Sequence, residues 1–143
     1  MSEHFRRLER MYNAAPINEY FRPTLHIPEA GVAELRLRIR PDFHHAARAA
    51  HGAVYFKALD DATFFAANSL VDDVFVLTVS FNLYLTRPVS EGEVVARGKV
   101  VSRSKRLYLA EGVLEDSRGR EIARGSGAFM PSTIALADLD EYR

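Results

Sequence analysis

Residues 52–70 read GAVYFKALDDATFFAANSL and predict one helix that is apolar around much of its circumference. Asn68 and Ser69, followed by Asp72 and Asp73, are typical of a helix end. A helix with so little polar surface has to be enclosed by other elements. The sequence on either side of it must therefore supply a surface that wraps it.

The segments that flank this helix predict strands. Residues 32–40 alternate between apolar and charged side chains, which is the pattern of a half-buried strand. The turn-like segment 28–31 separates that strand from a short one at 24–27. Further strand-like runs, bounded by turn residues, occupy residues 74–86, 92–102, 107–115 and 121–130. The order predicts an α+β fold in which one antiparallel sheet wraps the helix, with the last four strands as a meander.

The two ends of the chain are expected to differ. Residues 1–15 predict an amphipathic helix that packs on the main body, because apolar side chains recur there at helical spacing between charged ones. Residues 131–143 read as a mobile tail. We therefore expect residues 1–143 to form a single domain with its core at residues 24–130.

The composition limits the partners and the chemistry. The 143 residues include 19 basic and 19 acidic side chains, so no global field would attract nucleic acid or an anionic membrane. Cysteine is absent, which excludes thiolate catalysis and cysteine metal sites. No run approaches the roughly 18 apolar residues of a membrane span, and the charged first fifteen residues lack the apolar centre of a signal peptide. We expect a cytoplasmic protein.

The start of the helix carries a motif. The sequence HGA at residues 51–53, with Asp60 nine residues after the histidine, resembles the signature of the hotdog acyl-coenzyme A thioesterases. Within that family it is most similar to the phenylacetic-acid-degradation (4-hydroxybenzoyl-CoA thioesterase-like) branch. Residues 78–88, which end in Arg-Pro, and residues 122–125 resemble two strands of the same family. The resemblance implies a hotdog fold, an antiparallel sheet around one long central helix, over about residues 33–130.

The resemblance also implies a thioesterase site shared between two subunits. Asp60 would activate a water or attack the thioester directly, and Gly52 N–H of the other subunit would polarise the thioester carbonyl. Thr78 would help to hold the water. Coenzyme A would enter as part of the substrate, without a separate cofactor. The implied assembly is a homodimer whose sheets join edge to edge, or a homotetramer of two such dimers.

Elementary chemistry supports these roles independently. On a helical wheel Asp60 lies on a stripe that is otherwise small or apolar, so burial should raise its pKa. The first N–H groups of a helix lack partners and carry the positive end of the dipole, so Gly52 N–H could bind a thioester oxygen. Lys57, Asp61 and Asn68 are expected nearly opposite the buried arc. In a simpler alternative, Asp60 is a solvated carboxylate paired with Lys57.

Other residues also have an ordinary structural explanation. His51 is a candidate for proton transfer in the site, but it could simply cap or pack the start of the helix. Thr78, expected on the same strand face as Ser80 and Asn82, could be a common strand threonine. His45 stands where the resembled family usually has asparagine, and its ability to donate a hydrogen bond would depend on pH.

Basic side chains could bind the phosphates of coenzyme A, although charged hairpins are as often only solvated. The candidates are Arg87, Arg103, Lys105 and Arg106. We expect no metal site, because adjacent histidines on an extended segment point to opposite faces and no acidic partner has metal-ligand spacing. The histidines concerned are His44, His45 and His51.

Two other functions fit the same fold. The chain could be a non-catalytic module that binds acyl-CoA as an effector. Two departures from the resembled family favour this function: His45 in place of asparagine, and Ala53 in place of the second glycine of the signature. An enoyl-CoA hydratase or dehydratase would need a differently placed Asp-His pair, which the sequence lacks. The acyl group is left open, since aromatic side chains that could line an aryl or medium-chain pocket are more often core. These are Phe56, Phe64, Phe65, Phe81 and Tyr84.

Overall fold

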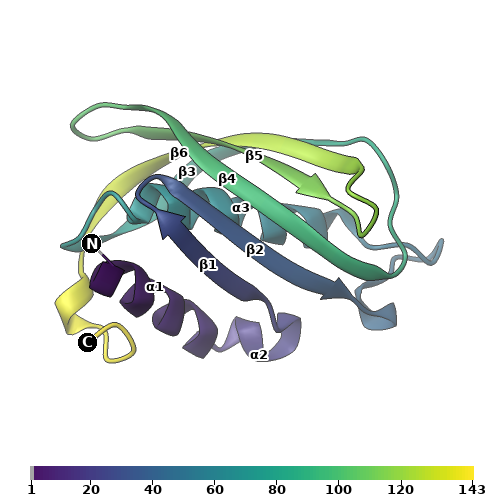
Figure 1. The fold of residues 1–143 in the computed structure, drawn as a ribbon, viewed down its shortest axis with the longest axis horizontal. Coiled ribbons are helices and arrows are strands. Elements are labelled where there is room, and N and C mark those ends of the chain that lie inside the picture. Colours follow the sequence, from purple (N-terminus) through teal and green to yellow (C-terminus); the bar gives the residue numbers. More distant parts are fainter. Residues whose placement is uncertain (1) are drawn as a thin grey trace.

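The computed structural model describes residues 2–143, in which one antiparallel sheet wraps a single long helix, α3, Gly52–Asn68 (Figure 1). The strands are β1 (Thr24–Glu29), β2 (Val32–Ile39), β3 (Val74–Leu85), β4 (Gly92–Arg103), β5 (Tyr108–Glu115) and β6 (Glu121–Ala135). The shorter helices are α1 (Ser2–Ala14), α2 (Ile17–Phe21), η1 (Pro41–Phe43) and η2 (Leu136–Asp138). The predicted α+β class is confirmed. So is the extra N-terminal helix, of which Met1 lies outside the described residues.

The strand order differs from the predicted meander. The sheet runs β1-β2-β4-β5-β6-β3, so β3 pairs with β6 at one edge and β2 pairs with β4 in the interior. Only β4, β5 and β6 form a meander. Turn residues mark where strands end, but α3 carries the chain across the sheet between β2 and β3. The position of β3 in the sheet therefore depends on where α3 ends, and β3 pairs with β6 rather than with β4.

Small residues allow α3 to lie very close to the sheet. Ala58, Ala62 and Ala66 of the helix are fully buried, and Gly98 of β4 lies against Ala62. A Cβ atom on Gly98 would lie 2.7 Å from the carbonyl carbon and oxygen of Ala62. The alternating apolar residues of β2 complete this core, as its pattern predicted.

Helix α1 covers the β1 edge of the sheet (Figure 1). Its buried side chains are His4, Phe5, Leu8, Met11 and Tyr12. The Arg6 guanidinium donates to the carbonyl of Ile27 over 2.7 Å, and the Glu9 carboxylate accepts from the N–H of Ile27 over 2.7 Å. The backbone carbonyl and N–H of Ile27, which an edge strand would otherwise expose, are thus hydrogen-bonded by side chains of α1.

The expectation of a mobile tail after residue 130 is wrong. Strand β6 continues to Ala135 and η2 follows, while Tyr142 is buried. The Tyr142 hydroxyl lies 2.7 Å from His4 Nδ1, and Arg10 donates to the Tyr142 carbonyl over 2.9 Å. The local sequence is polar, but its packing partner is the helix at the other end of the chain.

Helix α2 has no counterpart among the predicted elements, and Pro16 and Pro23 flank it. Proline is compatible with the start of a helix, and here Pro16 immediately precedes one. Within residues 2–143, no helix is both long and apolar enough to cross a bilayer.

Candidate active site

Asp60 lies on α3 beside strand β3, in partly buried surroundings. The Thr78 hydroxyl donates to Asp60 Oδ1 over 2.9 Å. Burial raises the pKa of Asp60 to about 6, although the hydrogen bond from Thr78 opposes the change. Such a group is ionised at neutral pH, yet more basic than an exposed aspartate, so it can accept a proton from water.

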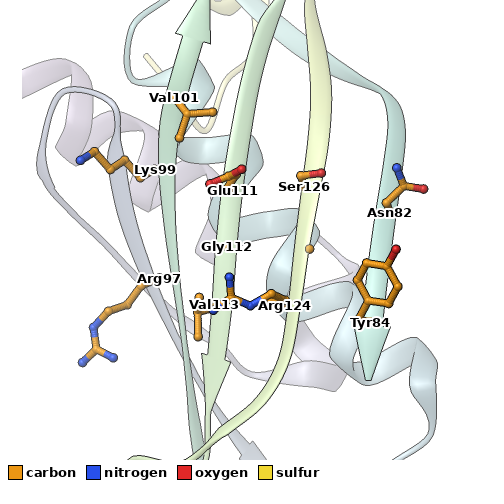
Figure 2. Close-up of a pocket in the computed structure, with 11 residues that line it drawn as sticks. Asn82, Tyr84, Arg97, Lys99, Val101, Glu111, Gly112, Val113, Arg124 and Ser126 are labelled. Atoms are coloured by element: carbon orange, nitrogen blue, oxygen red, sulfur yellow. The ribbon is translucent and has the colours of Figure 1, made fainter. Parts of the chain in front are cut away.

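A β-bulge turns Thr78 toward α3. Thr78 pairs with Phe129 and Ser80 pairs with Ala128, so β3 advances two residues while β6 advances one. Phe129 is fully buried against α3, which places Thr78 on the helix side. Figure 2 shows Asn82 on the opposite, outer face of the sheet. The prediction that Thr78 shares a face with Ser80 and Asn82 is therefore wrong, because the bulge interrupts strict alternation.

The neighbouring carboxylate, Asp61, is held by a residue of α1. The Tyr12 hydroxyl donates to Asp61 Oδ2 over 2.5 Å, and Lys57 Nζ lies 2.7 Å from the same oxygen. Burial raises the pKa of Asp61, opposed by Lys57 and Tyr12. Lys57 thus pairs with Asp61, and the alternative of a Lys57–Asp60 pair is wrong. Nor do Asp61 and Asn68 lie on an open face, since α1 covers Asp61 and Asn68 is fully buried.

A second group of predicted residues gathers at the first turn of α3. His51 Nδ1 accepts a hydrogen bond from Ala53 N–H over 2.9 Å, so His51 caps the helix. Gly52 follows and lines a cavity of about 310 Å³ together with His45 and Arg87. This cavity joins a helix N-terminus to a cation, and both suit an anionic or strongly polar ligand.

The loop after β3 is fixed to this turn by hydrogen bonds. The Tyr55 hydroxyl donates to the Arg87 carbonyl over 2.8 Å, and Ala50 N–H donates to the Val89 carbonyl over 2.8 Å. His45 Nδ1 accepts from Ala47 N–H over 3.0 Å. Arg87 is therefore held beside Gly52 by contacts that the sequence did not reveal.

The predicted residues do not all meet within one chain. Eight residues separate Gly52 from Asp60, which corresponds to about 12 Å along a helix. The turn that carries Arg103, Lys105 and Arg106 lies at the other end of β4 from the loop of Arg87 (Figure 1). Twelve residues of strand place the two roughly 40 Å apart.

Within residues 2–143, no three histidine or acidic side chains are grouped as metal ligands would be.

Asp60 also borders an apolar cavity of about 440 Å³, here called the α1–α3 cavity. Its walls come from α1, α2, α3, the start of β3, the end of β6 and the residues that follow β6. They include Met11, Ile17, Phe64, Phe65, Phe75 and Ile134. Of the aromatic residues considered for an acyl pocket, Phe64 and Phe65 line this cavity. Phe56 instead packs edge-to-face on Phe81, and Tyr84 lies on the outer face (Figure 2).

A further cavity of about 340 Å³ lies on the outer face of the sheet (Figure 2). Its arginines are already engaged by carboxylates: Arg97 lies 2.5 Å from Glu115, and Arg124 lies 2.7 Å from Glu121. None of the predicted site residues lines it. The candidate active site is therefore on the helix side of the sheet.

Comparison with known proteins agrees with this architecture. The sequence model of the thioesterase superfamily matches residues 48–123, whereas no curated protein matches the chain. The PaaI protein of the Escherichia coli phenylacetic acid degradation operon superposes with a TM-score of 0.85 at 14% identity, covering 94% of this chain and 96% of that one. A Haemophilus influenzae thioesterase gives 0.77 at 11% identity, covering 85% of each chain.

A putative esterase from Mycobacterium tuberculosis gives a TM-score of 0.78 at 22% identity, covering 82% of this chain and 97% of that one. At these identities the likeness shows the fold alone. The predicted hotdog fold is confirmed.

Proposed function

The chain belongs to the thioesterase superfamily, and from this premise we propose that it hydrolyses an acyl-CoA to the free acid and coenzyme A. The observation that carries the proposal is Asp60, a partly buried carboxylate with its pKa raised to about 6 and a hydrogen bond from Thr78. The spacing of Asp60 from the HGA motif supports the phenylacetic-acid-degradation branch.

The mechanism follows from the two groups of residues. Gly52 N–H of one subunit donates to the thioester oxygen as negative charge develops on it. Asp60 of the other subunit takes a proton from a water that Thr78 helps to hold, and the water oxygen bonds to the carbonyl carbon. The carbon–sulfur bond then breaks, and Asp60 returns the proton to the leaving thiolate. In the variant by direct attack, Asp60 Oδ bonds to the carbonyl carbon, the carbon–sulfur bond breaks, and the coenzyme A thiolate leaves and takes a proton from water. A second water then cleaves the resulting anhydride, which releases the free acid and restores the Asp60 carboxylate.

A dimer joined at β3 is part of this proposal. Asp60 and Gly52 of one chain are too far apart to contact one thioester group. Within residues 2–143 the outer edge of β3 has no partner strand, and Leu77 and Val79 are about half exposed there. The other edge, β1, is covered by α1. A second copy that pairs at β3 would satisfy the open edge and bring two α3 helices together, and two such dimers could form a tetramer.

Coenzyme A would then lie across the first turn of α3. Arg87 lines the cavity beside Gly52, so its guanidinium suits the phosphates of the substrate. His45 lines the same cavity and would be a second donor to the thioester oxygen, where the resembled family has asparagine. Arg103, Lys105 and Arg106 could assist only if the assembly brings that hairpin to the site.

The proposal is tested by the activity of an Asp60→Asn variant toward a panel of acyl-CoAs, with free thiol as the readout. We expect kcat/KM to fall by about 10²- to 10⁴-fold, the usual contribution of a general base. The matched control is Asp72→Asn, a change of an exposed carboxylate just beyond α3. Equal activity of the wild type and Asp60→Asn would contradict the assigned role, provided both fold alike by circular dichroism.

A second candidate function is a non-catalytic module that binds acyl-CoA. The observation in its favour is that His45 and Ala53 stand where the resembled family usually has asparagine and glycine. Thermal stabilisation by acyl-CoA without release of thiol from any substrate would support this alternative over hydrolysis.

A further inference from the structure

We propose that the α1–α3 cavity receives the acyl group and selects a neutral, apolar acyl chain over one that ends in a carboxylate. This inference rests on the proposed function, because it assumes that the thioester lies at Asp60. It adds the substrate class, and it assigns selectivity to segments outside the region that matches the superfamily.

The position of the cavity supports this assignment. Asp60 lies in its wall, so a thioester whose carbonyl carbon is within reach of Asp60 directs its acyl carbons into the cavity. The coenzyme moiety leaves in another direction, toward the Gly52 and Arg87 cavity of the other subunit of the proposed dimer. The two cavities therefore correspond to the two ends of one acyl-CoA.

The size and lining of the cavity suit an apolar group. Its volume of about 440 Å³ falls within the range of roughly 300–1,000 Å³ that small-molecule sites occupy. The ring of Phe64 packs against those of Phe65 and Phe75 with centroids 5.0 and 5.1 Å apart. These contacts hold the aromatic wall in place, so an acyl chain would gain burial without ordering the protein.

The charges around the cavity disfavour an anionic acyl end. Asp60, Asp61 and Glu141 line it, whereas Lys57 is its one lysine or arginine among the described residues. Lys57 Nζ is 2.7 Å from Asp61, whose carboxylate compensates the positive charge of the lysine. A substrate carboxylate would lose its hydration and meet a net negative charge, which makes the free energy of binding less favourable.

The wall opposite α3 is built from the two ends of the chain. Residues 11–18 and 134–141 supply it, and both segments lie outside residues 48–123. Substitutions in these segments should therefore change which acyl group binds without altering Asp60, Thr78 or Gly52.

The test uses unreactive thioether analogues of acyl-CoA, so that binding is measured without turnover. Ile134 lines the cavity and is 42% exposed, which allows a larger residue without disrupting the core. We expect Ile134→Trp to raise the Kd of the hexanoyl analogue at least tenfold and that of the acetyl analogue less than threefold. The control is Val101→Trp, an exposed position on the outer face, which should change neither Kd.

Charge selection is tested with the pentanoyl and succinyl analogues, which are similar in length. We expect the wild type to bind the succinyl analogue at least tenfold more weakly, and Glu141→Lys to reduce that difference. Equal binding of the two analogues by the wild type would overturn the charge argument.

Two results would overturn the location of the acyl group: an equal effect of Ile134→Trp on the short and long analogues, or no effect on either. Failure to bind any analogue would overturn the inference as well. The expected binding pattern without hydrolysis of the matching thioesters would overturn the proposed function alone.

Discussion

At the scale of single residues, two adjacent aspartates of one helix have different surroundings. Asp61 is held by Lys57 and by Tyr12 from α1, whereas Asp60 receives only the hydroxyl of Thr78. Burial raises the pKa of both carboxyl groups, but no cation contacts Asp60 among the described residues. Asp60 is therefore the better proton acceptor, and Asp61 is bound as part of the scaffold.

The pH dependence of hydrolysis should report this difference. Because the carboxylate form of Asp60 is the active one, kcat/KM should rise about tenfold per pH unit below about pH 6 and level off above it. Thr78→Val removes a hydrogen bond that lowers the pKa of Asp60, so the midpoint should move to higher pH. The measurement is a pH–rate profile of both proteins. A midpoint that shifts to lower pH in Thr78→Val would contradict the role given to the hydroxyl.

At the scale of elements, the close contact between α3 and β4 depends on Gly98. Its missing side chain lets the helix backbone approach the strand, and the nearest atoms are main-chain atoms of Ala62 and Thr63. Backbone atoms cannot relieve a steric clash by changing rotamer, as a flexible side chain can. This contact also sets the height of α3 over the sheet, and with it the position of Asp60 relative to Thr78.

We expect Gly98→Ala to lower the free energy of unfolding by about 1–3 kcal/mol, the usual cost of overpacking a core. The control is Lys99→Ala, the next residue of β4, whose side chain lies on the outer face (Figure 2) and should matter by less than about 0.5 kcal/mol. Urea denaturation of the two variants measures both values. Equal stability of Gly98→Ala and the wild type would show that the helix can shift at little cost.

At the scale of the whole molecule, one edge of the sheet is covered by a helix and the other is exposed. The β1 edge is covered by α1, through the bonds of Arg6 and Glu9 to the backbone of Ile27. The twelve-residue β3 edge carries exposed Leu77 and Val79. An open apolar edge of this length favours pairing with another strand.

The double variant Leu77→Lys with Val79→Lys should prevent that pairing, because charged side chains on an edge oppose strand addition. We expect a monomer by sedimentation velocity, with the far-ultraviolet circular dichroism of the wild type. Hydrolysis should fall at least 100-fold if Asp60 and Gly52 act from different subunits. The control is Val101→Lys, an exposed apolar residue away from β3, which should still pair at that edge. A fully active monomer would refute the shared site.

The sequence by itself determined the ends of most helices and strands and the partly buried position of Asp60. The apolar run of α3 and the alternation of the strands predicted every element's ends to within two residues, apart from β6 and the short helices α2, η1 and η2. The helical wheel placed Asp60 on a partly buried stripe. The sequence also allowed His51 to cap the helix, and the structure shows that it does. Periodicity and capping are local properties, because they depend on backbone geometry within a few residues.

Only the tertiary structure decided which distant segments meet. The pairing of β3 with β6, the bulge that turns Thr78 toward Asp60, and the contact of Tyr12 with Asp61 join residues far apart in the chain. So do the contacts of Tyr142 with α1, which order a segment whose own composition suggested none. Such contacts depend on the free energy of packing the whole chain, and no local pattern in the sequence records that quantity.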